Sequence, residues 1–184
     1  NVPLNEDSEF YPSTIYGGAK LASYQICNRI CLLNGVDFSW VRVFSTYGPK
    51  DNASWLIPYL INQLDSGASP KLTLCEQKWD YLYVEDAAEA VVAIAEKEKA
   101  AGAGAVNLGS GSAVPLRRIV KKVRDIVSPN TKLGFGEKPY RPDQVMFLEA
   151  DIKKIKRLTG WTPSTSLDHG LMKTIKWFRN VETG

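Results

Sequence analysis

The residues best suited to chemistry are a tyrosine and a lysine four positions apart, in Tyr16-Gly-Gly-Ala-Lys20. In a helix this spacing places both side chains on one face, about one turn apart. A phenol, with a reference pKa of about 10, is a poor base at neutral pH, and a neighbouring ammonium group favours its ionised form. Lys20 is therefore predicted to make Tyr16 easier to ionise and fit for acid–base catalysis. An ordinary amphipathic helix could carry the same two residues, so the surrounding sequence has to decide.

Composition narrows the class of protein. The chain has 184 residues, 44% of them hydrophobic and 23% charged, which is typical of a globular protein with a sizeable core. The net charge of +3 is spread along the chain, and its densest basic run, at 117–124, recurs at helical spacing. We interpret this run as a solvated helix face and expect no nucleic-acid partner. No apolar run approaches the roughly 18 residues of a membrane span and no signal peptide opens the sequence, so we expect a cytoplasmic protein without membrane contact.

Cysteine and histidine usage exclude several kinds of site. Cys27, Cys31 and Cys75 lack CxxC spacing, and we expect reduced thiols, with Cys27 and Cys31 on the inner side of a first helix. His169 is the only histidine, which leaves little from which to build a Ser–His–Asp triad or a multi-histidine metal site. No metal is therefore expected.

The elements around the Tyr16/Lys20 pair indicate an α/β protein. Ser13 is a plausible cap for a helix ending near Gly35, where a left-handed residue is favoured. A nearly continuous β-rich run at 38–44 follows at once, as expected of a buried parallel strand. The apolar face of the helix is predicted to comprise Ala19, Ala22, Ile26, Cys27, Ile30 and Leu33.

Further elements alternate along the rest of the chain. Helices are expected at 54–66, 85–97, 115–127, 151–160 and 167–179, and strands at 71–75, 79–84, 105–108, 131–135 and 145–148. Ser54 and Ser166 are predicted to cap the helices that follow them. In the 85–97 helix the inward residues are predicted to be Ala87, Ala88, Val91, Val92 and Ile94.

Five motifs in a fixed order resemble the extended short-chain dehydrogenase/reductases, specifically the NAD-dependent epimerase/dehydratase family that acts on nucleotide sugars. They are the Tyr16–Lys20 motif, Arg42-Val-Phe-Ser-Thr-Tyr-Gly-Pro49, Trp79-Asp-Tyr-Leu-Tyr-Val-Glu-Asp86, Val106-Asn-Leu-Gly-Ser-Gly111, and Arg141-Pro-Asp143 with Gly160-Trp-Thr-Pro163 and Leu167–Leu171 after it. Together the motifs span nearly the whole chain.

The resemblance implies an incomplete Rossmann-type, doubly wound parallel sheet with its N-terminal half absent, plus a smaller α/β substrate-binding domain. Residues 1–50 would be the remnant of the NAD(P)-binding domain, and 51–184 mainly the nucleotide-sugar domain, with about 79–110 returning to the Rossmann sheet. No G-x-G-x-x-G phosphate loop is found in the sequence. The family's catalytic Ser or Thr would lie upstream of Asn1. We therefore expect a fragment, or one piece of a split chain, that is inactive by itself.

The implied activity is epimerisation or dehydration of a nucleotide-diphosphate sugar, with NAD or NADP taking part in a transient oxidation at sugar C4. Tyr16 would be the acid/base, and Lys20 would also hydrogen-bond the nicotinamide ribose. The alternatives are an NAD(P)-dependent 4-ketoreductase of a nucleotide sugar and a non-catalytic binding or scaffold member of the same fold. The resemblance further implies a homodimer through the Tyr16 helix and a neighbouring helix, and the fragment itself could serve as an interaction module.

The resemblance also assigns cofactor and substrate residues. Tyr16, Lys20, Val43 and Phe44 would bind the cofactor, although Val43 and Phe44 fit a plain strand core equally well. The substrate would contact Ser45, Trp55, Leu56, Trp79, Arg141 and Asp143, with a core role as the alternative for Trp55 and Leu56.

Arg141 is the best diphosphate ligand among these, because a guanidinium binds phosphate oxygens bidentately. Trp79 departs from the family pattern, since many epimerases carry an arginine there that serves the diphosphate. A tryptophan cannot do so but could stack on a base. Ser45 stands where many relatives have asparagine. Asp80 and Asp86 are expected to be structural, with Asp86 capping the helix that follows it.

Overall fold

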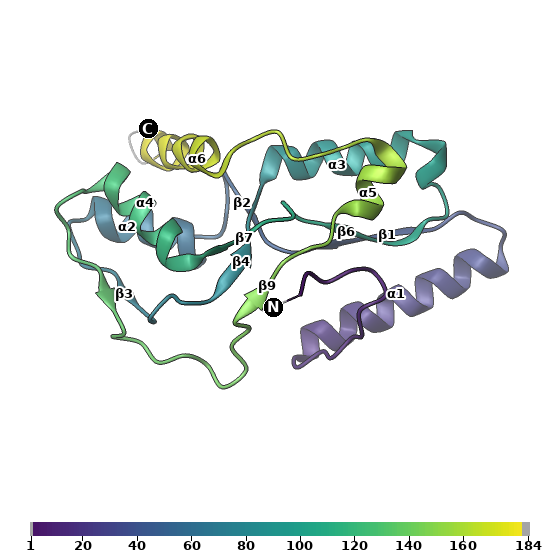
Figure 1. Ribbon diagram of the computed structural model, residues 1–184, viewed down its shortest axis with the longest axis horizontal. Coiled ribbons are helices and arrows are strands. Elements are labelled where there is room, and N and C mark those ends of the chain that lie inside the picture. The colour runs from purple at the N-terminus through teal and green to yellow at the C-terminus, as the bar shows by residue number, and fades with distance from the viewer. Residues whose placement is uncertain (1, 182–184) are drawn as a thin grey trace.

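The protein is an α/β structure in which helices alternate with short strands (Figure 1). The structure is a computed structural model and describes residues 2–181. Its helices are α1 (Ile15–Leu33), α2 (Leu56–Asp65), α3 (Val84–Glu96), α4 (Leu116–Val127), α5 (Lys153–Thr159) and α6 (Leu167–Val181), with the 3-10 turn η1 (Glu98–Ala100). Its strands are β1 (Ser39–Val43), β2 (Thr46–Tyr47), β3 (Lys71–Leu72), β4 (Lys78–Asp80), β5 (Leu82–Tyr83), β6 (Gly104–Leu108), β7 (Ala113–Pro115), β8 (Gly134–Phe135) and β9 (Phe147–Leu148).

Strand pairing is mostly parallel. β1 pairs with β6, β2 with β5, β3 with β8 and β4 with β9, each in parallel, whereas β4 and β7 are antiparallel. The strand predicted at 38–44 is confirmed as the parallel strand β1, although it is half-buried rather than buried, and the predicted strand at 105–108 is its partner β6. The short strands β2 and β7 were missed, because two or three residues give no readable periodicity.

Helices cover both sides of the β1–β6 pair, as in a doubly wound fold (Figure 1). On one side, α3 and α5 bury a core with β6, contributed by Ala90, Ile94, Val106, Leu108 and Ile155 among others. On the other side α1 lies against β1, where the Tyr24 ring is 5.7 Å from that of Trp40. A second core lies between α2, α4 and α6, with Leu60, Ile61, Ile119, Val123 and Leu171 at its centre.

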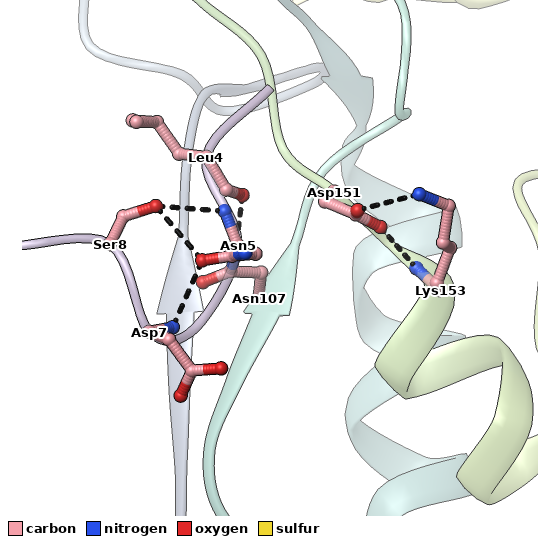
Figure 2. A network of polar contacts seen from close by, with 7 residues as sticks. All are labelled: Leu4, Asn5, Asp7, Ser8, Asn107, Asp151 and Lys153. Carbon is pink, nitrogen blue, oxygen red and sulfur yellow. Dashed lines mark hydrogen bonds and ion pairs between the residues drawn. The ribbon is translucent and has the colours of Figure 1, made fainter. Parts of the chain in front are cut away.

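The segment before α1 lies along β6 (Figure 2). Leu4 bridges Ala150 in parallel, and its carbonyl accepts a hydrogen bond of 2.9 Å from the Asn107 amide. Asn5 and Ser8 close a small turn, since the Ser8 hydroxyl lies 3.1 Å from the Asn5 backbone nitrogen. The loop predicted for this region is therefore largely non-helical, but it is fastened to the sheet rather than free.

The predicted inner face of α1 is wrong. Ile26, Ile30 and Leu33 are 55–67% exposed and Cys27 is also exposed. Ala19 and Ala22 are exposed too. The physical reason is that α1 carries a second stripe, Leu21, Tyr24 and Cys31, at the same helical spacing, and this stripe is the half-buried one facing β1. Of the two thiols predicted on the inner side of α1, Cys27 is exposed and Cys31 is half-buried, while Cys75 is buried elsewhere in the chain.

Several predicted caps and buried positions also need correction. Thr14, not Ser13, caps α1, because its hydroxyl oxygen accepts the Gly17 N–H at 3.0 Å. The Ser54 hydroxyl bonds the Asn52 side chain rather than capping α2. The Ser166 cap is present, with its Oγ 3.3 Å from the His169 nitrogen.

Helix α3 turns differently from the prediction. Ala87 and Ile94 are buried with Ala90, but Ala88, Val91 and Val92 are exposed. The predicted inward set lacks Ala90, which is fully buried. Ala87, Ala90 and Ile94 follow i, i+3, i+7 spacing, and this stripe leaves Ala88, Val91 and Val92 outside it.

Asp86 is structural but does not cap its own helix. Tyr83 occupies the cap position of α3, and the Asp86 carboxylate instead accepts hydrogen bonds from both the backbone and the hydroxyl groups of Ser164 and Thr165, at 2.8–3.2 Å. Asp86 therefore fastens the segment before α6 to α3.

Candidate active site

The first two turns of α1 hold the tyrosine and the lysine on one face. Thr14 ends the preceding extended segment and caps the helix, which fixes where the first turn begins. Tyr16 lies in that turn and is 72% exposed. The Lys20 ammonium lies over its ring, 5.5 Å from the ring centroid. The two side chains thus point toward each other and stay open to a ligand.

The carboxyl end of β1 supplies the next group of predicted residues. Backbone hydrogen bonds hold this end from two sides, because the Phe44 N–H donates to the Leu108 carbonyl at 3.0 Å and the Leu82 N–H donates to the Ser45 carbonyl at 2.8 Å. Val43 is 53% exposed, so it is not part of a strand core. The Val43 side chain lies near the start of α1, because Val43 and Tyr16 both line the same two cavities.

A cavity of about 830 Å³ brings most of the predicted site residues together, within the range usual for small-molecule sites. Eight of the ten predicted positions line it: Tyr16, Val43, Phe44, Ser45, Trp55, Leu56, Trp79 and Arg141. They come from α1, the end of β1, the start of α2, β4 and the loop between β8 and β9. Segments distant in sequence therefore meet around one space.

Two predicted residues lie outside this cavity. Lys20 lines a second cavity of about 570 Å³ between residues 9–12, α1 and β1, whose lining also includes Tyr16 and Val43. Tyr16 therefore stands at the junction of the two spaces. Asp143 is exposed and lines neither of them.

The larger cavity is rich in cations. Lys71, Lys138 and Arg141 line it together with a single carboxylate, Asp51. Burial raises the pKa of Asp51 above its ordinary value. Lys138 also lies 4.9 Å above the Tyr59 ring. Sequence reasoning missed Lys71 and Lys138, although Lys138 stands three residues before Arg141 in the same loop.

Aromatic side chains form the cavity wall around β4. The Trp79 indole N–H donates to the Val145 carbonyl at 2.8 Å, which fixes the ring against the β8–β9 loop. Tyr81, two residues after Trp79, also lines the cavity, and burial raises the pKa of its phenol. The Tyr81 phenol therefore stays protonated and can serve only as a hydrogen-bonding hydroxyl.

Trp55 and Leu56 begin α2 at the cavity edge. Trp55 occupies the cap position and is 56% exposed, which excludes the alternative core role for it. Leu56 is half-buried, and it packs against the core between α2, α4 and α6 while also lining the cavity.

Two kinds of feature are absent from the described residues. No helix within 2–181 is long and apolar enough to cross a membrane. The same part of the chain contains no group of three or more His, Cys, Asp or Glu side chains gathered as metal ligands.

Comparisons with known proteins agree on one family. A family model described as the NAD dependent epimerase/dehydratase family matches residues 1–109. CDP-abequose synthase of Salmonella muenchen is 26% identical over 79% of this chain and 47% of its own length. The dTDP-4-dehydro-6-deoxyglucose reductase of Escherichia coli is 27% identical over 97% of this chain and 57% of its own. The chain spans about half the length of the curated relatives that it matches.

The fold has close structural counterparts. An epimerase from Methanothermobacter thermautotrophicus superposes with a TM-score of 0.91 at 23% identity, covering 100% of this chain and 55% of that protein. Its likeness extends over every element of the present chain and agrees with a partial Rossmann-type fold. Because the family model matches more than half of the sequence, the chain belongs to the NAD-dependent epimerase/dehydratase family.

Proposed function

We propose that the whole protein to which this chain belongs is an NAD(P)-dependent nucleotide-sugar epimerase or dehydratase, in which Tyr16 is the acid/base of a transient oxidation at sugar C4. One observation carries the proposal: the Lys20 ammonium lies 5.5 Å from the centroid of the exposed Tyr16 ring, and Tyr16 shares a cavity with Arg141. The Tyr16 and Lys20 side chains are both exposed, so their pairing adds nothing to the packing of α1.

Proton transfer follows from this geometry. An ammonium group close to a phenol stabilises the phenolate by Coulomb attraction, strongly so where a bound ligand excludes water. The phenolate oxygen of Tyr16 would take the proton of the C4 hydroxyl as the C4–H bond breaks, leaving a 4-keto sugar. Return of the hydride to the opposite face of C4, and of the proton to the C4 oxygen, would give the epimer.

The residues present suit the nicotinamide end of a dinucleotide. Bound NAD(P) would supply the hydride acceptor. Lys20 offers N–H donors for ribose hydroxyls at the junction of the two cavities, and the exposed Val43 offers apolar surface beside it. The sequence contains no G-x-G-x-x-G for the dinucleotide pyrophosphate, so we expect this chain alone to bind the cofactor weakly and to be inactive.

The substrate proposed is a nucleotide-diphosphate sugar. Three cations, Lys71, Lys138 and Arg141, line the same cavity as Tyr16, and the guanidinium of Arg141 is exposed and open to a diphosphate. The cavity also offers the Trp55 and Trp79 rings for flat or apolar groups. Two relatives are named for a CDP-sugar synthase and a dTDP-sugar reductase, which supports a nucleotide sugar and leaves the base open.

A 4-ketoreductase is the second candidate. The match to dTDP-4-dehydro-6-deoxyglucose reductase over 97% of the chain favours it. The same Tyr16 would then donate its proton to the carbonyl oxygen of a 4-keto sugar, with reduced NAD(P) supplying the hydride.

We also propose that the protein is a homodimer through α1 and a neighbouring helix. Ile26, Ile30 and Leu33 form an exposed apolar stripe on α1, on the face turned away from β1. A stripe of this kind is costly to leave in water and matches itself in a two-fold interface.

The test uses full-length protein. Thermal shift with NAD or NADP, against UDP-, GDP-, CDP- and dTDP-sugars, identifies cofactor and nucleotide, and product analysis separates epimerisation, dehydration and reduction. Tyr16→Phe is expected to abolish turnover and leave dinucleotide affinity largely intact. Ser23→Ala is the control, because it removes an exposed hydroxyl from the same helix at a position that lines neither cavity. Residual turnover in Tyr16→Phe above about a tenth of wild type would refute the acid/base role.

A further inference from the structure

The most unusual polar group in the larger cavity is the carboxamide of Gln77. Gln77 is 5% exposed, and its Oε1 has no hydrogen-bond partner within the described residues. A buried amide oxygen without a partner costs roughly 1–3 kcal/mol, and most such atoms in proteins are satisfied. Because Gln77 lines the cavity, a bound ligand can supply the missing donor.

The backbone around Gln77 is fixed from several directions. The first two N–H groups of α4 donate hydrogen bonds to backbone carbonyls of this turn. The Leu116 N–H donates to the Gln77 carbonyl and the Arg117 N–H to the Cys75 carbonyl, each at 2.9 Å. The Glu76 N–H donates to the Tyr140 hydroxyl at 3.0 Å. Cys75 adopts a φ of 55°, a left-handed conformation that is uncommon outside glycine. The turn therefore holds Gln77 in one direction, as a recognition group requires.

Alternation along β4 places flat rings beside the amide. Gln77, Trp79 and Tyr81 are two residues apart, so they share one side of the strand, and all three line the cavity. The Trp79 ring is held by its bond to the Val145 carbonyl. An amide next to fixed aromatic rings suits a planar heterocycle, whose face contacts the rings while its edge meets the amide.

The position of Gln77 also fits the base of a nucleotide sugar. In Figure 1, β3 and α1 lie on opposite sides of β4. The loop from β8 to β9, which carries Lys138 and Arg141, runs from the β3 side back toward β4. A sugar at Tyr16 and a diphosphate at that loop would place the base toward the turn between β3 and β4, which ends in Gln77.

We propose that Gln77 is the residue that recognises the nucleobase, its Oε1 accepting an N–H from the edge of the base and its Nε2 donating to the acceptor atom beside that N–H. Uracil, thymine, guanine and cytosine each present an N–H beside an acceptor, and a carboxamide matches that pattern. The inference rests on the proposed nucleotide-sugar function and adds the group that distinguishes bases.

The experiment measures calorimetric affinities of the full-length protein for UDP, CDP, GDP and dTDP. We expect wild type to prefer one base, and Gln77→Met to weaken that nucleotide by about 10- to 100-fold, the loss of a two-point amide–base pair, while the others change less. NAD(P) affinity should not change. The matched control, Gln25→Met, makes the same substitution at an exposed position on α1 and should alter nothing.

Unfolding of the ligand-free variants separates recognition from a structural role. Removing an unsatisfied buried amide should leave the melting temperature of Gln77→Met equal to or above that of wild type. Gln77→Glu, which keeps the size and an acceptor but loses the donor, should also lose base preference. A lowered melting temperature in Gln77→Met, or equal losses for all four nucleotides, would overturn the assignment in favour of a structural or phosphate role.

The two proposals fail in different ways. If wild type binds NAD(P) but no nucleoside diphosphate, the nucleotide-sugar function is wrong and the Gln77 assignment with it. If wild type prefers one base and Gln77→Met retains that preference, only the Gln77 assignment is wrong.

Discussion

Replacing Asp80 by asparagine tests how the cavity wall is held in place. Asp80 is fully buried between Trp79 and Tyr81, and its carboxylate accepts three backbone N–H groups. Oδ1 lies 2.6 Å from the Ser110 nitrogen, and Oδ2 lies 3.0 Å from the Gly111 nitrogen and 3.1 Å from the Ala150 nitrogen. One side chain thus joins β4, the turn after β6 and the end of β9.

The cost of Asp80→Asn follows from these three bonds. Asparagine keeps one oxygen, and the least damaging orientation places it at Oδ2, retaining two bonds, with the NH₂ group facing the Ser110 N–H. The lost bond leaves a buried donor unsatisfied, at about 1–3 kcal/mol, and the two retained bonds weaken by about 0.5–1 kcal/mol each on losing the charge. Relief of the carboxylate's desolvation returns part of this. We expect a net loss of about 2–4 kcal/mol in the free energy of unfolding.

Urea unfolding of the full-length protein, followed by tryptophan fluorescence and circular dichroism, measures this loss. Asp125→Asn is the matched control, because Asp125 is exposed and pairs only with its neighbour Arg124, so its loss should stay below about 1 kcal/mol. The side chain at position 80 has little room to move away from these N–H groups. Gly109 packs so closely against it that a Cβ at position 109 would lie 2.7 Å from Asp80 Oδ2. If Asp80→Asn and Asp125→Asn are equally stable, the three-bond account of this wall is wrong.

Two further predictions concern the ligand and the assembly. Arg141→Ala should weaken nucleotide-sugar binding by about 10-fold or more in calorimetry and leave NAD(P) binding unchanged, and Arg141→Lys should recover only part because it cannot bind bidentately; unchanged affinity would exclude a diphosphate contact. The double substitution Ile26→Glu with Ile30→Glu should convert the proposed dimer to a monomer in light scattering, whereas Gln25→Glu should not, and a dimer that survives the charges must form elsewhere.

Much of the fold could be predicted because it is local or periodic. The β-rich run at 38–44 became β1, and the left-handed Gly35 and Gly160 follow α1 and α5 as helix ends require. Parallel pairing followed from a helix leading directly into a β-rich run. The buried face of α1 could not be predicted, since two apolar stripes lie on that helix and only tertiary contact selects the one facing β1.

The site was predictable where a residue type carries its own chemistry. Tyr16 and Lys20 have a spacing with physical meaning, and Arg141 is a phosphate ligand by its shape. Lys71 and Gln77 have neither signal, because a lone lysine or glutamine reads as surface. They became candidates only when the fold placed one in the cavity wall and buried the other without a partner.

The departure at Trp79 shows how these two sources of evidence combine. An indole has one N–H donor, and in this structure that donor is used by the Val145 carbonyl, so Trp79 has nothing to offer a diphosphate. Lys71, Lys138 and Arg141 nevertheless line the same cavity against one carboxylate. The positive charge that a diphosphate needs is therefore available without a cation at position 79. Position 79 is then free to serve as a rigid ring beside Gln77, which is why the tryptophan and the unpartnered amide are best explained together, as parts of one surface for a base.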